Sequence, residues 1–202
     1  YHGYDYEIVE TADGRCWFGE YLRSESFNDG TLLSSDYYDL GVPDGLDINP
    51  PCYTIIPTGH IYNGSTIRYT AGGSQMAKNI CPVGWHVPSR LEWQELVSSY
   101  SDNRGSYVSM WSDETTSQNL LLWESLGTSG LNLKATGLDE QYNSGPDYNG
   151  RARYWTSTTA FDPASMLYIT YLGSTSNWYQ PNWVQYKRGN EGLPIRCIKD
   201  AE

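Results

Sequence analysis

Apolar and polar residues alternate near both ends of the chain and follow a helical period in its middle. From Tyr4 to Ile8 every second residue is apolar or aromatic, and an Asp13-Gly14 pair follows, which predicts two short strands joined by a tight turn. Three short runs with β-branched and aromatic residues predict further strands, at residues 166–172, 182–188 and 194–200. Strands at both ends around a helical middle predict an α+β domain.

The clearest helical signal begins at Ser89, within the stretch ICPVGWHVPSRLEWQEL. Ser89 and Glu92 form a capping-box pattern, in which each side chain bonds the backbone N–H of the other residue. The following period predicts an apolar face at Trp93, Leu96, Val97 and Tyr100, and a solvent-facing side at Arg90, Gln94 and Glu95. A second helix is predicted from Asp113 to Leu126, with Asp113 as its cap and Gly127 as its stop.

Residues 24–66 are dense in Gly, Pro, Asp-Gly and Asn-Gly, which predicts little regular structure. The interspersed aromatic, Ile and Leu residues favour an ordered loop packed on the core over a disordered linker. Asn63-Gly64-Ser65 matches the N-glycosylation pattern, but Asn-Gly is also a strong turn signal, and we interpret it as a turn. The carboxylates of this region lack the spacing of a calcium loop and are interpreted as a solvated acidic surface: Asp36, Asp39, Asp44 and Asp47.

Composition and charge narrow the classes of partner. The chain has 202 residues, which suits one domain, and carries 18 Tyr and 8 Trp against 3 Phe. Tyr and Trp suit both cores and wet binding surfaces, because each joins apolar area to a hydrogen-bonding group. The formal net charge of −11 argues against nucleic acid and anionic lipid, which are bound through clustered Lys and Arg. No run reaches the ~18 apolar residues of a membrane helix, so membrane insertion is not expected.

The start of the chain lacks a basic and hydrophobic signal segment, which fits a cytosolic protein or a mature or excised piece of a longer one. The chain has four cysteines: Cys16, Cys52, Cys81 and Cys197. Their even number favours disulfides and an oxidising compartment. They show no Cys-x-x-Cys spacing, which is typical of zinc and redox sites. Four cysteines allow three disulfide connectivities, and spacing alone does not choose among them.

Motifs of known catalytic chemistry are missing from the sequence. It has no G-x-S-x-G elbow, no phosphate-binding glycine loop, no H-E-x-x-H and no paired histidines at ligand spacing. His86 is the one histidine inside a dense motif, and we expect a buried ring that hydrogen-bonds the backbone and fixes a turn. His2 and His60 are isolated. No residue pattern nominates a carboxylate pair for glycoside hydrolysis, so we predict no catalytic residue, no metal ligand and no cofactor.

The stretch from Ser176 to Gly192, SNWYQPNWVQYKRGNEG, mixes aromatic rings with amide and hydroxyl groups. Rigid aromatic area beside adaptable polar groups is typical of surfaces that recognise sugar rings or proteins. The alternative is that half of these rings face the core of a sheet. We expect a mixture, in which one parity of each strand is buried and the other is displayed.

Five segments together resemble the Fibrobacter succinogenes major paralogous domain, in the same order and over nearly the whole chain. They are GRCWFGEYLRS, ICPVGWHVPSRLEWQEL, GLNLKATG, GRARYWTST and GLPIRCIKD. The resemblance implies one domain over residues 1–202 with a C-type lectin-like fold, two helices, small antiparallel sheets and long ordered loops. It also implies a disulfide between Cys81 and Cys197, with Cys16 and Cys52 as the second pair.

The same resemblance implies a place outside the cell, on a bacterial surface or on a virion such as a phage fibre tip. Some related lectin-like domains are diversified by retroelements near their C-terminal end. By position, the equivalent ligand-binding surface would comprise Tyr168, Tyr171, Asn177, Trp178, Tyr179, Asn182, Trp183, Gln185 and Tyr186.

These observations lead to the hypothesis of a non-catalytic receptor-binding or adhesin module, whose partner is a cell-surface protein or glycan. In a fibre such a module could form a homo-oligomer. Two alternatives remain open. One is an enzyme related to the formylglycine-generating enzymes, whose chemistry needs reactive cysteines. The other is a structural spacer in a large surface protein, whose aromatic residues would be mostly buried.

Overall fold

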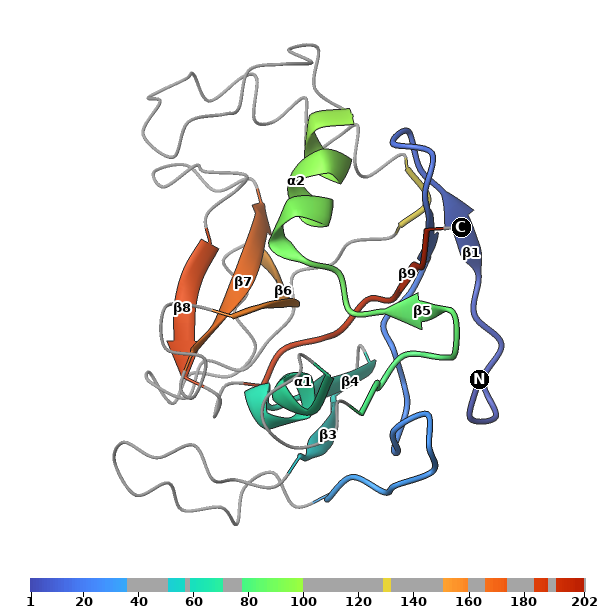
Figure 1. Ribbon diagram of the computed structural model, residues 1–202, viewed down its shortest axis with the longest axis vertical. Coiled ribbons are helices and arrows are strands. Elements are labelled where there is room, and N and C mark those ends of the chain that lie inside the picture. The colour runs from blue at the N-terminus through green and yellow to red at the C-terminus, as the bar shows by residue number, and fades with distance from the viewer. Residues whose placement is uncertain are drawn as a thin grey trace.

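The structure, a computed structural model, describes residues 1–35, 51–56, 59–70, 78–99, 129–131, 151–159, 166–173, 184–188 and 192–201. Within these residues the chain forms an α+β arrangement of two helices and three small antiparallel sheets (Figure 1). This confirms the predicted fold class at the level of its secondary structure. The predicted helix over 113–126 lies outside the described residues.

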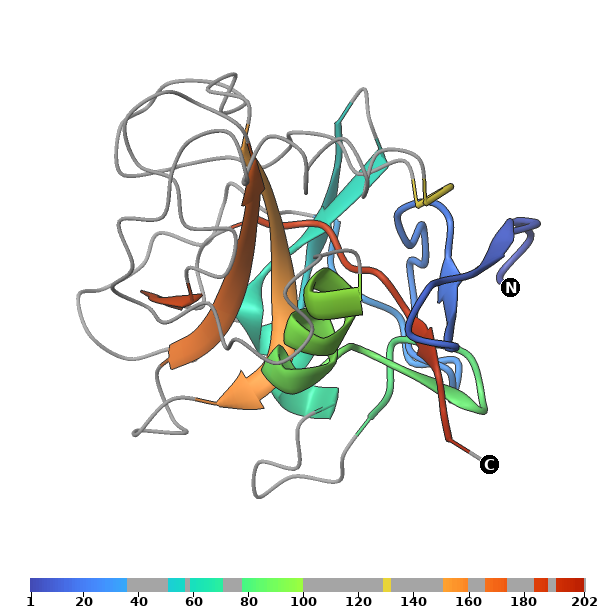
Figure 2. The same ribbon diagram turned by 90° about the horizontal axis from the view of Figure 1, so that it is seen from above.

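The four-stranded sheet joins the first and last parts of the chain. Its order is β1 (Ile8–Glu10), β2 (Cys16–Phe18), β9 (Ile198–Lys199) and β5 (Trp85–His86). The predicted hairpin is confirmed: the Thr11 N–H donates to the Arg15 carbonyl at 2.9 Å, and Gly14 supplies the positive φ of +79° that the turn requires. The two ends of the chain lie on the same side of the molecule (Figures 1 and 2).

Regular structure also occurs where the sequence predicts little of it. β3 (Tyr53–Ile56) and β4 (Gly59–Tyr62) form a two-stranded sheet, and α1 (Gly64–Thr70) follows directly. The predicted Asn63-Gly64 turn is wrong, because Asn63 caps α1: its Oδ1 accepts from the Thr66 N–H at 3.1 Å. The same oxygen accepts from the Cys52 N–H at 3.1 Å, and the side chain is only 2% exposed, which closes it to glycosylation.

Helix α2 (Arg90–Ser99) begins with the predicted capping box. The Ser89 N–H donates to Glu92 Oε2 at 2.7 Å, and the Glu92 N–H donates to Ser89 Oγ at 3.2 Å. Trp93 and Leu96 are buried as predicted, and Glu95 is exposed. Tyr100 and the side chains of Gln94 and Val97 lie outside the described part of the chain.

The three-stranded sheet consists of β6 (Arg151–Thr159), β7 (Met166–Gly173) and β8 (Val184–Arg188), in that order. The strands predicted at 166–172 and 182–188 are confirmed within the described residues. Helix α1 contacts β6, and α2 contacts both β6 and β7. Figure 2 shows this sheet on the opposite side of the molecule from the two chain ends.

Two buried clusters hold these parts together. The larger contains Phe18, Tyr62, Ile67 and Trp155, and the smaller contains Trp17, Trp93, Leu96 and Tyr154. Buried Arg196 donates from its guanidinium to the Phe18 carbonyl at 2.8 Å, and this guanidinium lies 4.7 Å from the centre of the Tyr21 ring. A cation–π contact of this kind lets a charged group remain in an aromatic interior.

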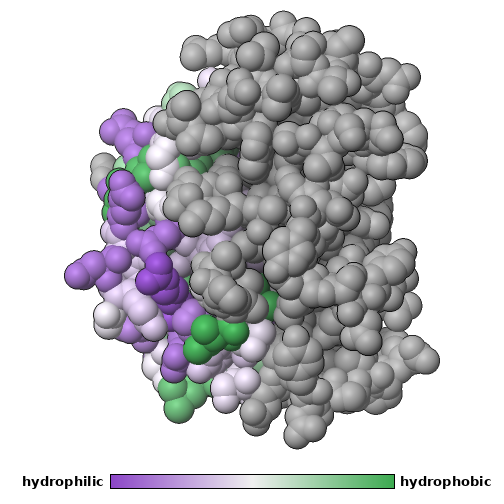
Figure 3. Space-filling view, turned by 180° about the vertical axis from the view of Figure 1, so that it is seen from behind, coloured by the Kyte–Doolittle hydropathy of each residue, from purple (hydrophilic) through white to green (hydrophobic). Residues whose placement is uncertain are grey.

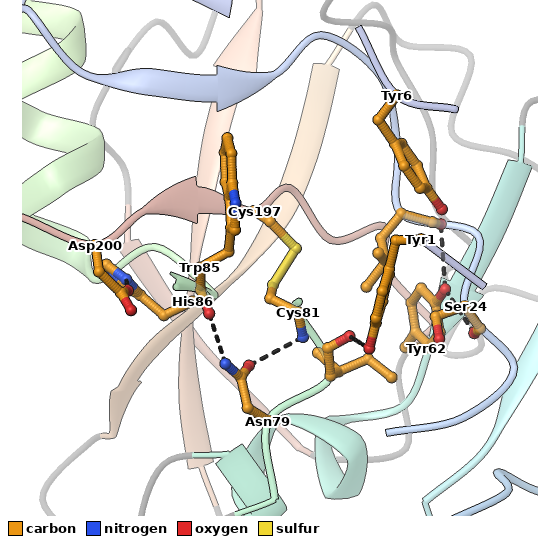
Figure 4. Close-up of a disulfide and its surroundings, with 12 residues drawn as sticks. Tyr1, Tyr6, Ser24, Tyr62, Asn79, Cys81, Trp85, His86, Cys197 and Asp200 are labelled. Atoms are coloured by element: carbon orange, nitrogen blue, oxygen red, sulfur yellow. Dashed lines mark hydrogen bonds and ion pairs between the residues drawn. A yellow bond between two sulfur atoms is a disulfide. The ribbon is translucent and has the colours of Figure 1, made fainter. Parts of the chain in front are cut away.

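A disulfide joins Cys81 to Cys197 with a Cα–Cα distance of 5.9 Å, the pairing implied by the family resemblance (Figure 4). Asn79 supports it, because its Oδ1 accepts from the Cys81 N–H at 2.9 Å while its Nδ2 donates to the Trp85 carbonyl.

The second implied pair is wrong, because Cys16 and Cys52 form no disulfide. Cys16 lies in β2 opposite Glu10, whereas Cys52 directly precedes β3 and is bonded to the Asn63 cap. The two cysteines are therefore held by different sheets.

Breaking the Cys81–Cys197 disulfide is expected to destabilise the protein by about 4 to 5 kcal/mol, since the bridge closes a loop of 116 residues in the unfolded chain. Guanidinium unfolding with and without reductant measures the difference, and mass mapping of a non-reduced digest identifies the linked peptides. A Cys16→Ser variant is the control and should keep the same sensitivity to reductant. An unfolding midpoint that does not respond to reductant would contradict the prediction.

Candidate functional site

The three-stranded sheet is anchored through one of its edge strands, β6. Trp155 is fully buried, and its Nε1–H donates to the Tyr62 carbonyl at 2.7 Å on the side of α1. Tyr154 is also fully buried and stacks on Trp93 of α2, with ring centres 5.0 Å apart. Adjacent residues of a strand point to opposite faces, so the two helices cover opposite faces of β6. This double anchorage makes β6 a firm base for the two strands that follow it in the sheet, β7 and β8.

Four of the predicted ligand-binding residues lie on β7 and β8, and the backbone register places them relative to one another. Tyr168 is directly opposite Tyr186, Gln185 is opposite Ile169, and Tyr171 is opposite Arg153. The other five predicted residues lie outside the described part of the chain: Asn177, Trp178, Tyr179, Asn182 and Trp183.

The register also divides these four positions between the faces of the sheet. Tyr154 pairs with Thr170, and Tyr168 lies two residues from Thr170, so Tyr168 and Tyr186 share the face of Tyr154. Trp155 pairs with Ile169, and its face is shared by Tyr171 and Gln185. The predicted set is therefore not one flat surface, because it contains positions on both faces.

A second group of polar side chains surrounds His86 at the end of the four-stranded sheet. His86 Nε2 lies 2.9 Å from Glu92 Oε1, and its Nδ1 lies 2.5 Å from Asp200 Oδ1. Arg15, from the β1–β2 turn, approaches the same Glu92 oxygen at 3.3 Å and also pairs with Glu95. The expectation of a buried ring bonded to the backbone is wrong: the side chain is 35% exposed and its partners are two carboxylates.

The charges of this group are mutually stabilising. The hydrogen bond that His86 donates to Glu92 raises the pKa of His86 above its ordinary value, against the effect of burial and with help from Asp200. Burial opposes ionisation of Glu92, but the hydrogen bonds from His86 and Ser89 outweigh it and lower the pKa of Glu92 to about 2. A ring that donates to carboxylates from both nitrogens is an imidazolium. It ties β5, α2 and the C-terminal segment together and has no nitrogen left to accept a proton.

Apolar residues do not gather on the surface that the structure describes. The large exposed ones belong to separate elements and loops: Ile8, Leu32, Ile55, Val83 and Leu91. Figure 3 shows hydrophilic residues between small, separate apolar areas on one side of the molecule. Among the described residues, no cluster of three or more His, Cys, Asp or Glu could hold a metal ion, and neither helix is long and apolar enough to cross a membrane.

The family comparison agrees with the order of segments seen in the sequence. The model of the Fibrobacter succinogenes major domain matches residues 11–199, nearly the whole chain. The chain belongs to this family. The matched region of this Fibrobacter succinogenes major domain includes the Cys81–Cys197 disulfide, the capping box and every strand of the three sheets except β1. No curated protein and no solved structure matched the chain.

Protonated His86 is expected to stabilise the fold by about 1 kcal/mol, a small value because the ion pairs are partly exposed. Its folded-state pKa is raised, so this contribution is complete below about pH 6.5 and is lost as the pH rises through the folded-state pKa. Urea unfolding of wild type and His86→Gln over this range measures it: the difference should be largest in acid and shrink in alkali. His2→Gln is the control. A difference that grows with pH would contradict the assignment.

Proposed function

We propose that this chain is a non-catalytic recognition module with a C-type lectin-like fold, acting as a receptor-binding or adhesin domain outside the cell. The observation that carries the proposal is the Tyr168–Tyr186 pair, placed directly across β7 and β8 of a sheet whose edge strand β6 is fixed by two buried aromatic residues. Aromatic groups held on a rigid support lose little entropy on binding, which favours their use as contact residues.

The ligand would be a cell-surface glycan or protein, met by the outer part of the sheet and by the segment between β7 and β8. That segment contributes Trp178, Tyr179 and Trp183, together with the amides of Asn177 and Asn182. Aromatic faces stack on sugar rings or fill protein pockets, and amides bond hydroxyl or backbone groups. The net charge of −11 favours a neutral or basic partner.

The arrangement of the ends supports a module within a larger surface protein or fibre. Strands from the start and the end of the chain pair in one sheet, while the β6–β7–β8 sheet lies on the opposite side (Figure 2). Domains whose ends lie together can be placed in a longer chain without disturbing the rest of the fold. The ligand-binding side would then point away from the neighbouring parts of that chain.

Two features make the enzyme alternative less favourable. Cys197 is bonded to Cys81, and Cys16 and Cys52 belong to different parts of the fold, so none of these cysteines forms a reactive pair. The nitrogens of His86 are both engaged by carboxylates, which leaves this residue unsuited to general-base chemistry.

Alanine substitution of Tyr168 or Tyr186 is expected to weaken ligand binding by about fivefold or more, because truncating a central tyrosine at an interface costs at least ~1 kcal/mol. Tyr171→Ala, on the other face by register, should have a smaller effect. Trp178→Ala and Trp183→Ala should also weaken binding. Binding is measured with labelled domain on an array of immobilised glycans and on intact bacterial cells.

Val83→Ala is the control, since Val83 is 86% exposed and lies before β5. Circular dichroism and an unchanged unfolding midpoint verify that each variant is folded. Wild-type affinity in all the tyrosine and tryptophan variants would exclude this surface. A folded wild-type domain that binds neither the array nor the cells would favour the spacer alternative.

A further inference from the structure

His60, in β4, is enclosed by aromatic rings. Tyr53 stacks on it with ring centres 5.3 Å apart and an interplanar angle of 24°, and Tyr62 lies 6.4 Å away at 22°. Tyr4 approaches edge-on, with its ring centre at 6.5 Å. The residue is only 4% exposed. Such an aromatic, buried environment usually holds an apolar side chain, but here it holds a titratable one.

Neither ring nitrogen of His60 has a hydrogen-bond partner, and both are buried. The nearest carboxylate belongs to Glu25, whose Oε1 lies 3.8 Å from Nε2, too far for a hydrogen bond. Buried polar groups in folded proteins nearly always have partners, so this exception calls for an explanation. Both nitrogens are closed to solvent, so only a very small ligand can reach them. The proton is the smallest such ligand.

The groups around the ring determine how it responds to a proton. Its neighbours are the hydroxyl-bearing rings of Tyr4, Tyr53 and Tyr62, the carboxylate of Glu25 and the guanidinium of Arg23. Tyrosine is uncharged near neutral pH, so only Glu25 and Arg23 carry charge here. Burial lowers the pKa of His60, Glu25 opposes this effect, and Arg23 adds to it. The ring is therefore neutral at pH 7.

We propose that His60 is a pH-sensitive switch for the β3–β4 hairpin, closed while the ring is neutral and opened when acid protonates it. An imidazolium buried among three tyrosines is costly unless a carboxylate bonds it. Glu25 is 54% exposed and 3.8 Å away, so it can close this distance only if its own segment or the hairpin moves. Nδ1 would still lack a partner on the opposite side of the ring, which favours loosening of β4.

The hairpin is connected to the rest of the fold through Tyr62, two residues from His60. The Tyr62 hydroxyl donates to the carbonyls of Leu22 and Ser24, and the Tyr62 carbonyl accepts from Trp155 Nε1 in β6. Loosening of β4 would therefore weaken the anchorage of the β6–β7–β8 sheet. The switch itself does not depend on whether that sheet binds a ligand.

The direction in which pH changes the stability of the closed hairpin follows from how strongly the closed and open forms bind a proton. The unfolded or opened chain takes up a proton near the ordinary histidine value of about 6.5, whereas the closed hairpin resists it. The stability of the closed form is therefore complete above about pH 6.5 and falls as the pH is lowered towards the folded-state pKa. Below the folded-state pKa of His60, the stability of the closed form no longer changes with pH.

Proton NMR of the histidine ring signals tests whether His60 is protonated only at low pH. The signals are assigned with the variants His2→Gln, His60→Phe and His86→Gln. The expected result is that His60 titrates at lower pH than the ordinary histidine value, while His86 titrates above it. A His60 signal that titrates at or above the ordinary value would overturn the proposal, and this measurement uses only the wild-type protein for its titration.

Amide hydrogen exchange tests the opening. After correction for the intrinsic pH dependence, protection of the Thr54–Tyr62 amides is expected to fall by about tenfold or more between about pH 7.5 and pH 5. In His60→Phe, which keeps an aromatic ring and cannot titrate, that loss should be absent. In Glu25→Gln the loss should continue to lower pH before it reaches its plateau, because the carboxylate that raises the pKa of the ring in the closed form is gone. Equal loss of protection in wild type and His60→Phe would overturn the proposal.

Discussion

The pairing of β9 with both β2 and β5 is the interaction on which the rest of the structure depends. Main-chain bonds join the last strand to one strand from the beginning of the chain and one from its middle, and the Cys81–Cys197 bridge reinforces the connection. The segment before β9 carries Arg196 and Ile195 into the core, where Ile195 bonds Leu22 through the backbone. Contacts this distant in sequence are costly to form, and the covalent bridge lowers the entropy that they must offset.

His86 and His60 occupy opposite electrostatic environments. His86 stands between carboxylates at a partly exposed edge and is stabilised as a cation, whereas His60 lies among aromatic rings and is stabilised as a neutral ring. Falling pH therefore strengthens one contact and weakens the other. The four-stranded sheet and the β3–β4 hairpin respond to acid in opposite directions, although they share one hydrophobic core through Phe18 and Tyr62.

Features that depend on neighbouring residues were predictable from the sequence, and features that depend on distant partners were not. The Ser89–Glu92 box and the β1–β2 hairpin need contacts within a few residues.

The strand β6 was missed because Tyr154 and Trp155 are both buried, so the strand lacks an alternation between apolar and polar positions. The Asn63 cap resembled a turn because one of its partners, Cys52, lies 11 residues away in the chain. For His86, the partner Asp200 is 114 residues away and gives no local signal. The candidate recognition residues followed from composition and family position, while their division between two faces needed the register of β7 and β8.

The disulfide also determines how the domain would carry mechanical load. A pull applied through the two ends of the chain reaches Cys81 from one side and Cys197 from the other, and the covalent bond then transmits the tension directly between them. Helix α2 and the β6–β7–β8 sheet lie in the segment enclosed by that bond, outside the path of the force. Strands β1 to β4 and α1 precede Cys81, so they lie in the part of the chain that this force can extend. Under shear, the segment before Cys81 could thus lengthen, while the segment between Cys81 and Cys197 would bear no direct tension.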